Sequence, residues 1–489
     1  FKSSSPKMKR SKFFKLLQTL SNLELQAFAG YLKHQNKGLG LARLLFEHIA
    51  SFAPDYTTTG ELESEYFIRA FLKVTPNSAS RKRLYNELSK LSMALKEFLL
   101  WQRFQQQTFE KNFMLAEILR ERKMDGEAEN ALALARKSLV SSSSKTTSSS
   151  PTVDHWHFLK LLKYHHFLYY STQSFQLTAQ TDELQAAMSY LDLFYASSKL
   201  KYSCELKSRE HILNEQHSIF LLEELQTQLP AVDWSGQDAI QLYQQSLALI
   251  LNGSEEGFET LFQSLKVETN TLTSTDKKII LTYLLNFCIS RVREGHSRYM
   301  DIIFQVYAFA AAKELLLDRG IIASTRFNNI VDAACKIGQF AWIEQFIDQY
   351  TTYLPPDTRS ETIRIAQALV HFTQGDYGAT LVQLRDGRFK NMDHSFRARW
   401  LTICCFCALK EIKSLQAACD AARQYLKRNQ QINRMLIKAT QNLIVIVNQI
   451  SKYQYKRGGK KGKKRLLDKL SQLHPIVYKM WLEQQIRQL

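Results

Sequence analysis

Apolar residues recur along most of the chain at steps of three and four, which is the spacing of one face of an α-helix. The clearest stripe would lie on one long helix and pack into a core, and it consists of Leu84, Leu88, Leu91, Leu95 and Phe98. Glycine and proline, which interrupt helices, are scarce, with 17 and 8 copies in 489 residues. This pattern favours helices separated by short loops over a turn-rich β fold. The sequence therefore predicts an all-α protein.

Capping signals predict where two helices start in the N-terminal part of the chain. Ser21 and Glu24 have the spacing of a capping box, in which each residue bonds the backbone amide of the other. A helix should therefore begin near Asn22. Thr58 and Glu61 repeat the spacing ahead of the apolar segment YFIRAFL, which predicts a second helix there.

Composition divides the chain into five segments. Residues 138–153 are rich in serine and threonine and bury little, so we expect a linker. This linker separates an N-terminal helical domain with a basic start, 1–137, from a larger helical domain, 154–450. A basic loop of glycine and lysine, 451–465, and a terminal capping helix, 466–489, complete the predicted organisation.

Turn signals recur in the larger domain with a period of about 36 residues. Gly375 lies 37 residues after Gly338, and a weaker signal follows at Lys410 and Glu411. Two antiparallel helices and two turns fit this period. Such a helical hairpin cannot bury its apolar face alone and must stack on neighbouring hairpins.

Over residues 325–425 the sequence resembles the tetratricopeptide-like (TPR-like) helical repeats. With Gly338 at the turn between the helices, the large apolar positions and the terminal proline of the family fall on Phe327, Ile330, Phe340, Ile347 and Pro355. The chain departs from the family at Val331, Ile343 and Tyr350, where small residues are preferred. The resemblance implies an α-solenoid of stacked hairpins behind the N-terminal helical domain. The whole chain also resembles bacterial helical proteins of similar length, which implies no activity.

The formal net charge of +19 is concentrated near the two ends of the chain. Residues 1–23 contain six Lys or Arg and residues 452–465 contain eight, with no acid in either stretch, so these stretches hold 14 of the 19 charges. Clustered cations release counterions when they bind phosphates, and neighbouring tyrosines could stack on bases. The candidate polyanion-binding residues are Lys452, Lys456, Arg457, Lys460, Lys461, Lys463, Lys464 and Arg465. The alternative is a solvated loop between two helices.

The stretch GGKKGKK does not match a phosphate-binding P-loop. Only three residues separate Gly458 from Gly462, and Lys464 stands where the motif needs a hydroxyl. No other nucleotide-binding or hydrolase signature is present in the sequence. We therefore expect no cofactor and no enzymatic activity.

Two clusters of metal-binding residue types have alternative structural explanations. His155, His157, His165 and His166 place two histidines about two helical turns apart, which is compatible with a metal site but also with an aromatic helix interface. The seven cysteines lie in apolar helical contexts, and the one Cys-x-x-Cys spacing, in CCFC, has no second pair nearby. Buried, reduced cysteines are the expectation there, and they favour a reducing compartment.

The expected location is the cytoplasm. No run of 18 or more apolar residues is available to span a bilayer. Lys15 and Glu24 interrupt the apolar stretch near the start, which argues against a secretory signal. That stretch predicts a basic amphipathic helix whose apolar face either packs within its own domain or lies on an anionic membrane.

The function predicted first is a non-enzymatic protein-binding scaffold or adaptor, because stacked hairpins form grooves that hold peptides or partner helices. The alternative is a nucleic-acid or ribosome-associated factor that binds through the basic N-terminus and the 452–465 stretch.

Overall fold

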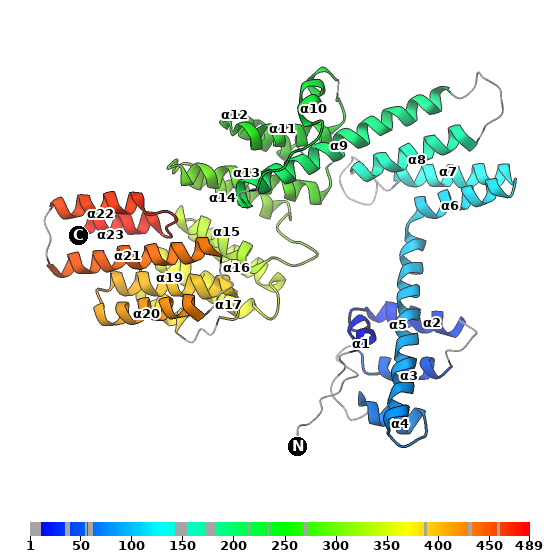
Figure 1. Cartoon of the computed structure of the whole chain (residues 1–489), viewed down its shortest axis with the longest axis horizontal. Coiled ribbons are helices and arrows are strands. Elements are labelled where there is room, and N and C mark those ends of the chain that lie inside the picture. The colour runs from blue at the N-terminus through cyan, green and yellow to red at the C-terminus, as the bar shows by residue number, and fades with distance from the viewer. Residues whose placement is uncertain are drawn as a thin grey trace. The chain divides into compact units, whose positions relative to one another are not determined.

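The protein is all-α within the residues that the structure describes (Figure 1). This computed structural model describes residues 11–34, 40–53, 56, 62–141, 154–171, 181–213, 215–232, 234–267, 272–385, 389–428, 433–456 and 460–489. These residues form 23 α-helices and two short 3-10 helices, and an isolated bridge between Asp318 and Ile321 is the only β pairing among them. None of the described helices combines the length and apolar character needed to cross a membrane. The predicted all-α class is confirmed for this part of the chain.

The chain divides into two compact units. The first comprises Phe1–Pro151 with Trp156–Asp192, and the second comprises Thr152–His155 with Leu193–Leu489. The division after Asp192 falls inside a single helix, rather than in the serine-rich segment where the sequence places the linker. Each unit is described by itself below.

The predicted linker, 138–153, starts too early. Helix α7 (Asp125–Ser141) continues into it, and the Ser138 hydroxyl donates a hydrogen bond of 2.6 Å to the carbonyl of Ala135. A serine that bonds its own helix in this way does not end it. Residues 142–153 of the predicted linker lie outside the described residues.

Five helices of the first unit surround one core, in which the long helix α5 packs against each of the other four. The predicted apolar stripe lies on α5, and all five of its residues are buried. The helices are α1 (Lys12–Leu17), α2 (Asn22–His34), α3 (Gly40–Ala50), α4 (Ser64–Phe71) and α5 (Ser78–Gln106).

The first predicted capping box is confirmed. The Ser21 amide donates to Glu24 Oε2 at 2.8 Å, the Glu24 amide donates to Ser21 Oγ at 3.3 Å, and α2 begins at Asn22 as expected. Thr58 and Glu61, the second predicted capping pair, lie outside the described residues. A helix does follow them, since α4 covers most of the apolar segment YFIRAFL.

The basic start of the chain packs within its own unit. Phe13, Phe14 and Leu17 of α1 are 1%, 0% and 0% exposed, and they belong to the core around α5. The apolar face of this helix is thus used inside the protein, which favours the packing interpretation over the membrane one. Residues 1–10 lie outside the described residues.

The remaining helices of the first unit form a second, smaller core. They are α6 (Thr108–Glu121), α7, α8 (His155–Ser171, from Trp156 on in this unit) and the first part of α9 (Thr181–Leu213). Helices α6 and α7 pair closely, and Phe109, Leu132 and Tyr164 are buried between the three helices α6, α7 and α8. An amphipathic hairpin is thus completed by a third helix that covers its apolar face.

Consecutive helices of the second unit pack in pairs, and the first helices of successive pairs pack on one another, as α15 does on α17 and α17 on α19. One continuous apolar core runs through this unit. The helices from α10 to α16 are α10 (Leu222–Gln228), α11 (Asp238–Asn252), α12 (Glu255–Lys266), α13 (Ser274–Arg293), α14 (Tyr299–Ala312), α15 (Ser324–Lys336) and α16 (Phe340–Tyr350). Those from α17 on are α17 (Arg359–Thr373), α18 (Tyr377–Leu384), α19 (Met392–Ala408), α20 (Ile412–Arg428), α21 (Arg434–Lys456), α22 (Lys460–Gln472) and α23 (Lys479–Gln488).

Six helices end in the same type of turn. In each, an amide donates to the carbonyl five residues earlier, and the residue before that amide has a positive φ, which defines the Schellman motif. The residues with positive φ are Lys123, Gly295, Glu314, Gly338, Gly375 and Lys410. The corresponding bonds join Met124 to Leu119, His296 to Arg291, Leu315 to Ala310, Gln339 to Ala334, Asp376 to His371 and Glu411 to Phe406 at 2.8–3.1 Å. The three turns predicted from the 36-residue period are among them.

The predicted basic loop, 451–465, is wrong for the described part of that range, which is helical. Helix α21 continues to Lys456 and α22 begins at Lys460. Gly462 lies inside α22 against the ring of Tyr453, so close that a Cβ would clash with it. This glycine therefore permits the two helices to approach instead of opening a loop, and lysine itself is a good helix former.

The predicted single capping helix, 466–489, is also wrong. Helix α22 ends at Gln472, and α23 begins only at Lys479. Between them lies Pro475, which lacks a backbone N–H and disfavours helical backbone at the preceding residue. The connection between the two helices is described below, because it contacts other helices of the unit.

A buried carboxylate links three helices of the second unit. Asp276, 3% exposed at the start of α13, accepts hydrogen bonds from Lys201 Nζ on α9 at 2.8 Å, from Tyr243 Oη on α11 at 2.5 Å and from Thr273 Oγ1 at 2.6 Å. Burial alone would raise the pKa of this carboxyl, but the bonds from Lys201, Thr273 and Tyr243 outweigh it and hold the pKa below its usual value. The cluster therefore favours the ionised carboxylate.

We expect Asp276→Ala to lower the free energy of unfolding by about 3 kcal/mol, because it leaves Lys201 without its buried partner and removes a bond at the start of α13. Urea unfolding followed by circular dichroism measures this. Asp420→Ala is the matched control, since the Asp420–Arg423 pair is exposed and should contribute less than about 1 kcal/mol. Equal effects of the two substitutions would contradict the prediction.

Candidate functional site

The first helices of three successive pairs, α15, α17 and α19, pack side by side with α21, and we call the surface that these four helices share the repeat face. The chain itself occupies part of it. Residues 473–481 connect α22 to α23 and include the start of α23, and they contact α17, α18 and α21 through ring contacts and hydrogen bonds. We call these residues the C-terminal segment.

Two aromatic rings of the C-terminal segment pack on one phenylalanine of the repeat face. The ring centroids of Tyr478 and Trp481 each lie 5.4 Å from that of Phe372, which is 5% exposed at the end of α17. Tyr377, the first residue of α18, completes the cluster at 5.7 Å from Phe372. Tilted and edge-on pairs at these distances are the favoured geometries of aromatic side chains.

Two hydrogen bonds fix the same segment. Trp481 Nε1 donates to Tyr377 Oη at 3.1 Å, and Asn442 Nδ2 on α21 donates to the carbonyl of Pro475 at 2.8 Å. Tyr478 has a φ of 53°, which places a bulky residue in the left-handed region. Strain of this kind is retained only where surrounding contacts impose it.

Charged groups of α15 and α19 lie near the Tyr478 side chain. Arg397 is bonded to Asp393 at 2.9 Å and to Asn329 Oδ1 at 2.6 Å, so its guanidinium is fixed in place. Burial raises the pKa of the Tyr478 hydroxyl well above its usual value, with Asp332 adding to the rise and Arg397 opposing it. The neutral hydroxyl is therefore the form that the folded unit favours.

A buried histidine lies at the start of α19. His394 is 0% exposed, with Nδ1 3.4 Å from Glu361 Oε2 and Nε2 3.4 Å from Thr362 Oγ1. Burial lowers the pKa of His394, and the neighbouring carboxylates of Glu361 and Asp393 offset only part of that effect. The neutral imidazole is therefore the form that the folded unit favours.

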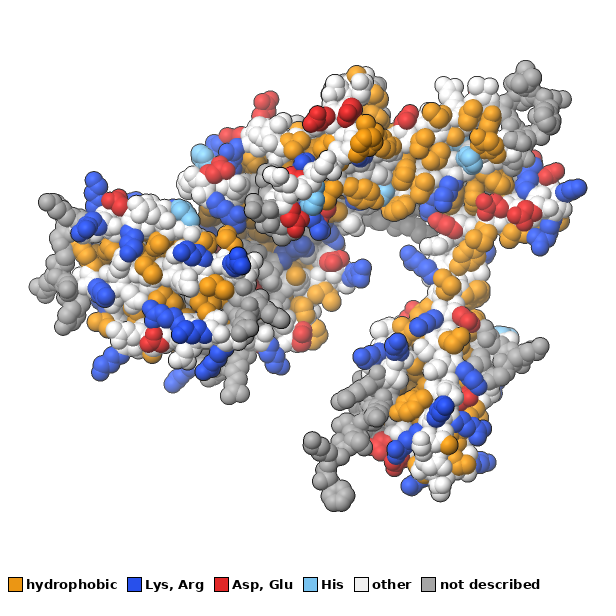
Figure 2. Space-filling view, in the orientation of Figure 1, with side chains coloured by type: hydrophobic (Ala, Val, Ile, Leu, Met, Phe, Trp, Pro, Cys, Tyr) orange, Lys and Arg blue, Asp and Glu red, His pale blue; other side chains and the backbone are white. Residues whose placement is uncertain are grey.

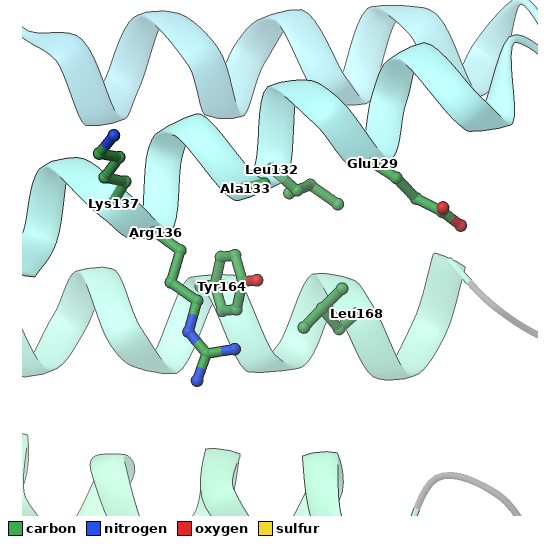
Figure 3. Close-up of a pocket in the computed structure, with 7 residues that line it drawn as sticks. All are labelled: Glu129, Leu132, Ala133, Arg136, Lys137, Tyr164 and Leu168. Carbon is green, nitrogen blue, oxygen red and sulfur yellow. The ribbon is translucent and has the colours of Figure 1, made fainter.

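A separate pocket lies in the first unit between α7 and α8 (Figure 3). Its volume is about 500 Å³, within the range of ligand-binding clefts. Five lining residues lie on one face of α7 at helical spacing and two lie one turn apart on α8: Glu129, Leu132, Ala133, Arg136, Lys137, Tyr164 and Leu168. No sequence signal singled out this pocket, because its charged residues look like an ordinary solvated helix face.

The pocket has an apolar floor and charged ends. Leu132 and Leu168 contribute the aliphatic surface, while Glu129 and Lys137 lie at opposite ends in Figure 3. The guanidinium carbon of Arg136 is 5.9 Å from the ring centroid of Tyr164, within range of a cation–π interaction. Burial raises the pKa of the Tyr164 hydroxyl, and Arg136 opposes part of that rise. The arrangement suits an apolar group flanked by charge and presents no nucleophile with an activating base.

The candidate polyanion-binding residues lie on two helices. Lys452 and Lys456 belong to the end of α21, five others belong to α22, and Arg457 lies outside the described residues. Lys464 and Arg465 are exposed, whereas Lys463 Nζ lies 3.4 Å from the carbonyl of Arg487 on α23. The five on α22 are Lys460, Lys461, Lys463, Lys464 and Arg465.

The histidine cluster does not form a metal site. Among the described residues, no group of three or more His, Cys, Asp or Glu is placed to hold a metal ion. His165 Nδ1 lies 2.5 Å from Glu183 Oε2, and its ring stacks on Tyr190 at 5.2 Å. These contacts match the aromatic helix interface that was the alternative interpretation.

All seven cysteines are free and buried, as the apolar contexts predicted. Burial raises the pKa of Cys405 and of Cys407 to about 12, and raises that of Cys404 well above its usual value. Thiols this hard to ionise are poor nucleophiles and poor metal ligands. The Cys-x-x-Cys spacing is therefore a packing feature of α19.

Comparisons with protein-family models, with curated proteins and with solved structures found no match for this chain. The geometry of its own residues is thus the basis for any functional assignment.

We expect the second unit to lose stability as pH falls from 8 to 5.5. The folded-state pKa of His394 lies below the ordinary value of 6.5, so the unfolded chain binds a proton there that the folded unit resists. The neutral His394 imidazole makes its full contribution to the free energy of unfolding above pH 6.5. That contribution is lost as the pH falls through the folded-state pKa of His394. The pKa of Glu361 is also lowered, so its contribution is lost only below its ordinary value of 4.5.

His394→Gln should reduce the slope of unfolding free energy against pH by up to about 1.4 kcal/mol per pH unit in this range. Thermal or urea unfolding at half-unit pH steps measures it. The exposed His296 provides the control, since His296→Gln should leave the slope unchanged. A His394→Gln slope equal to that of the unmodified protein would show that the buried imidazole is not the sensitive group.

Proposed function

We propose that this protein is a non-enzymatic protein-binding scaffold, and that the pocket between α7 and α8 holds a segment of its partner. The observation that carries the proposal is the pocket itself, which has about 500 Å³ of volume, an aliphatic floor and charged ends. Grooves between packed helices bind amphipathic helices by taking their apolar side chains. Part of this proposal is a TPR-like α-solenoid, supported by paired packing and by six turns of one type.

The partner suited to this pocket is an amphipathic helix with an acidic residue beside its apolar anchors. Its aliphatic side chains would cover Ala133 and Leu168, and its acid would face Arg136 and Lys137. At the other end Glu129 favours a basic residue, which fixes the direction of the bound helix. Charge arranged in this way supplies specificity more than affinity.

Exposed apolar side chains elsewhere in the first unit also support a binding role. Leu184, Met188 and Leu191 are 39%, 56% and 43% exposed, and they follow one another at steps of four and three along α9. Figure 2 shows hydrophobic side chains gathered over this helix. Contiguous exposed apolar surface is typical of interaction sites.

The proposal places the protein in a reducing compartment such as the cytoplasm. Seven free, buried cysteines support that location, because secreted proteins use cysteines mainly in disulfides.

Ala133→Arg and Arg136→Glu test the pocket, since the first fills it and the second reverses its charge while both positions are exposed. We expect each to weaken partner binding at least about tenfold. Affinity purification from nuclease-treated lysate, followed by titration of the recovered protein, measures the effect. Lys413→Glu, an exposed change on α20, should leave binding intact. Recovery of the same proteins by all three variants would reject the pocket.

A second candidate function is nucleic-acid or ribosome binding through the end of α21 and through α22. The observation that favours it is that five of the eight clustered cations lie on one helix, which holds their backbone in a fixed arrangement. A preformed cationic helix loses less conformational freedom on meeting a phosphate backbone than a loop would.

Changing Lys460, Lys461, Lys463 and Lys464 to Gln tests this second function on double-stranded DNA. We expect the slope of log affinity against log salt to become less negative by about 3 to 4, because each phosphate contact contributes about 0.9. Fluorescence polarisation at several salt concentrations measures it. Lys413 and Lys427 on α20, changed to Gln together, are the control. An unchanged slope in the α22 variant would exclude these residues as the contact.

A further inference from the structure

The repeat face binds a peptide, and the peptide is part of the same chain. The C-terminal segment leaves α22 after Gln472, crosses α21 where Asn442 bonds the Pro475 carbonyl, and reaches Phe372 and Tyr377 through Tyr478 and Trp481. These contacts join residues that lie 33 to 109 positions apart along the chain. A helix that merely covered the end of the stack would contact only the neighbouring pair.

We propose that the C-terminal segment is a built-in ligand of the repeat face, and that a partner peptide carrying Tyr-x-x-Trp after a proline displaces it. This site is distinct from the α7–α8 pocket and does not rest on it. The repeat face supplies what such a peptide needs: the Phe372 ring for both aromatic side chains, the Tyr377 hydroxyl for the indole N–H, and the Asn442 amide for a backbone carbonyl.

Three features make the segment displaceable. Tyr478 and Trp481 are only partly buried, in contrast to Leu482 and Ile486, which are 0% exposed and anchor α23. Two single hydrogen bonds hold the segment, from Trp481 Nε1 to Tyr377 Oη and from Asn442 Nδ2 to the Pro475 carbonyl, in place of a continuous backbone ladder. Tyr478 also holds a left-handed backbone conformation, and an incoming peptide need not adopt it. Release of residues 473–481 would therefore unwind the start of α23 and leave the rest of that helix attached through Leu482 and Ile486.

The partner's chemistry follows from the groups that surround the site. Burial raises the pKa of the Tyr478 hydroxyl, with Asp332 adding to the rise and Arg397 opposing it, so a neutral tyrosine fits there. A phosphorylated tyrosine would bring its charge close to Asp332 as well as to Arg397, and burial opposes any added charge. The geometry thus selects an unmodified aromatic peptide.

The test uses a fluorescently labelled synthetic peptide of residues 473–483 and the full-length variant Tyr478→Ala/Trp481→Ala. Removing both rings should free the repeat face, so the peptide should bind this variant at least tenfold more tightly than it binds the unmodified protein. A peptide with the same two residues changed to alanine should bind neither. Adding Tyr377→Phe to the variant should weaken binding about fivefold, because it removes the acceptor for the indole and keeps the ring.

A folded double variant that fails to bind the peptide would overturn the proposal, and its folding is checked by circular dichroism and a cooperative melt. Hydrogen exchange on the unmodified protein gives a second measurement if the variant does not fold. There, excess peptide should speed exchange of amides 476–481 while leaving α21 protected. Unchanged exchange at millimolar peptide would also overturn it. Ala133→Arg, which alters the α7–α8 pocket, should change neither peptide binding at the repeat face nor the hydrogen exchange of residues 476–481. A negative result here would therefore not reject the α7–α8 pocket.

Discussion

Every helical pair in this protein has an apolar face that the pair cannot bury by itself, and this constraint shapes the rest of the structure. In the first unit the α6–α7 pair is covered by α8, and α1 to α4 bury their faces on α5. In the second unit each pair is covered by the next, so one core runs through many helices. Stability is therefore shared between neighbouring helices. Helix α23 packs against both α21 and α22.

The elements that could be predicted from the sequence are those with a strong local cause. Gly338 and Gly375 mark turns because a positive φ costs glycine nothing, and the Ser21–Glu24 capping box fixes the start of α2. The same turn at Lys123 and Glu314 gave no signal, since tertiary packing imposes a backbone that these residues do not prefer. Gly462 favoured a loop in the sequence-based prediction, but it lies inside α22, where it permits close approach to Tyr453 on α21.

The candidate sites were harder to foresee, because neither has a local signature. The pocket residues of α7 follow ordinary helical spacing, and only the position of Tyr164 on α8 makes a concave surface of them. The aromatic pair Tyr478 and Trp481 looked like part of a capping helix until the structure placed it against Phe372, more than one hundred positions earlier. Contacts of that range depend on the whole arrangement of pairs, which periodicity alone does not specify.

The basic stretch combines two properties, its positive charge and the close contact between Gly462 and Tyr453. Lys464 and Arg465 are exposed on α22, so their charge can be changed with little effect on packing. Position 462 cannot take a side chain unless the Tyr453 ring moves. A lysine-rich replacement that placed a side chain there would keep the charge and disturb the contact between α21 and α22.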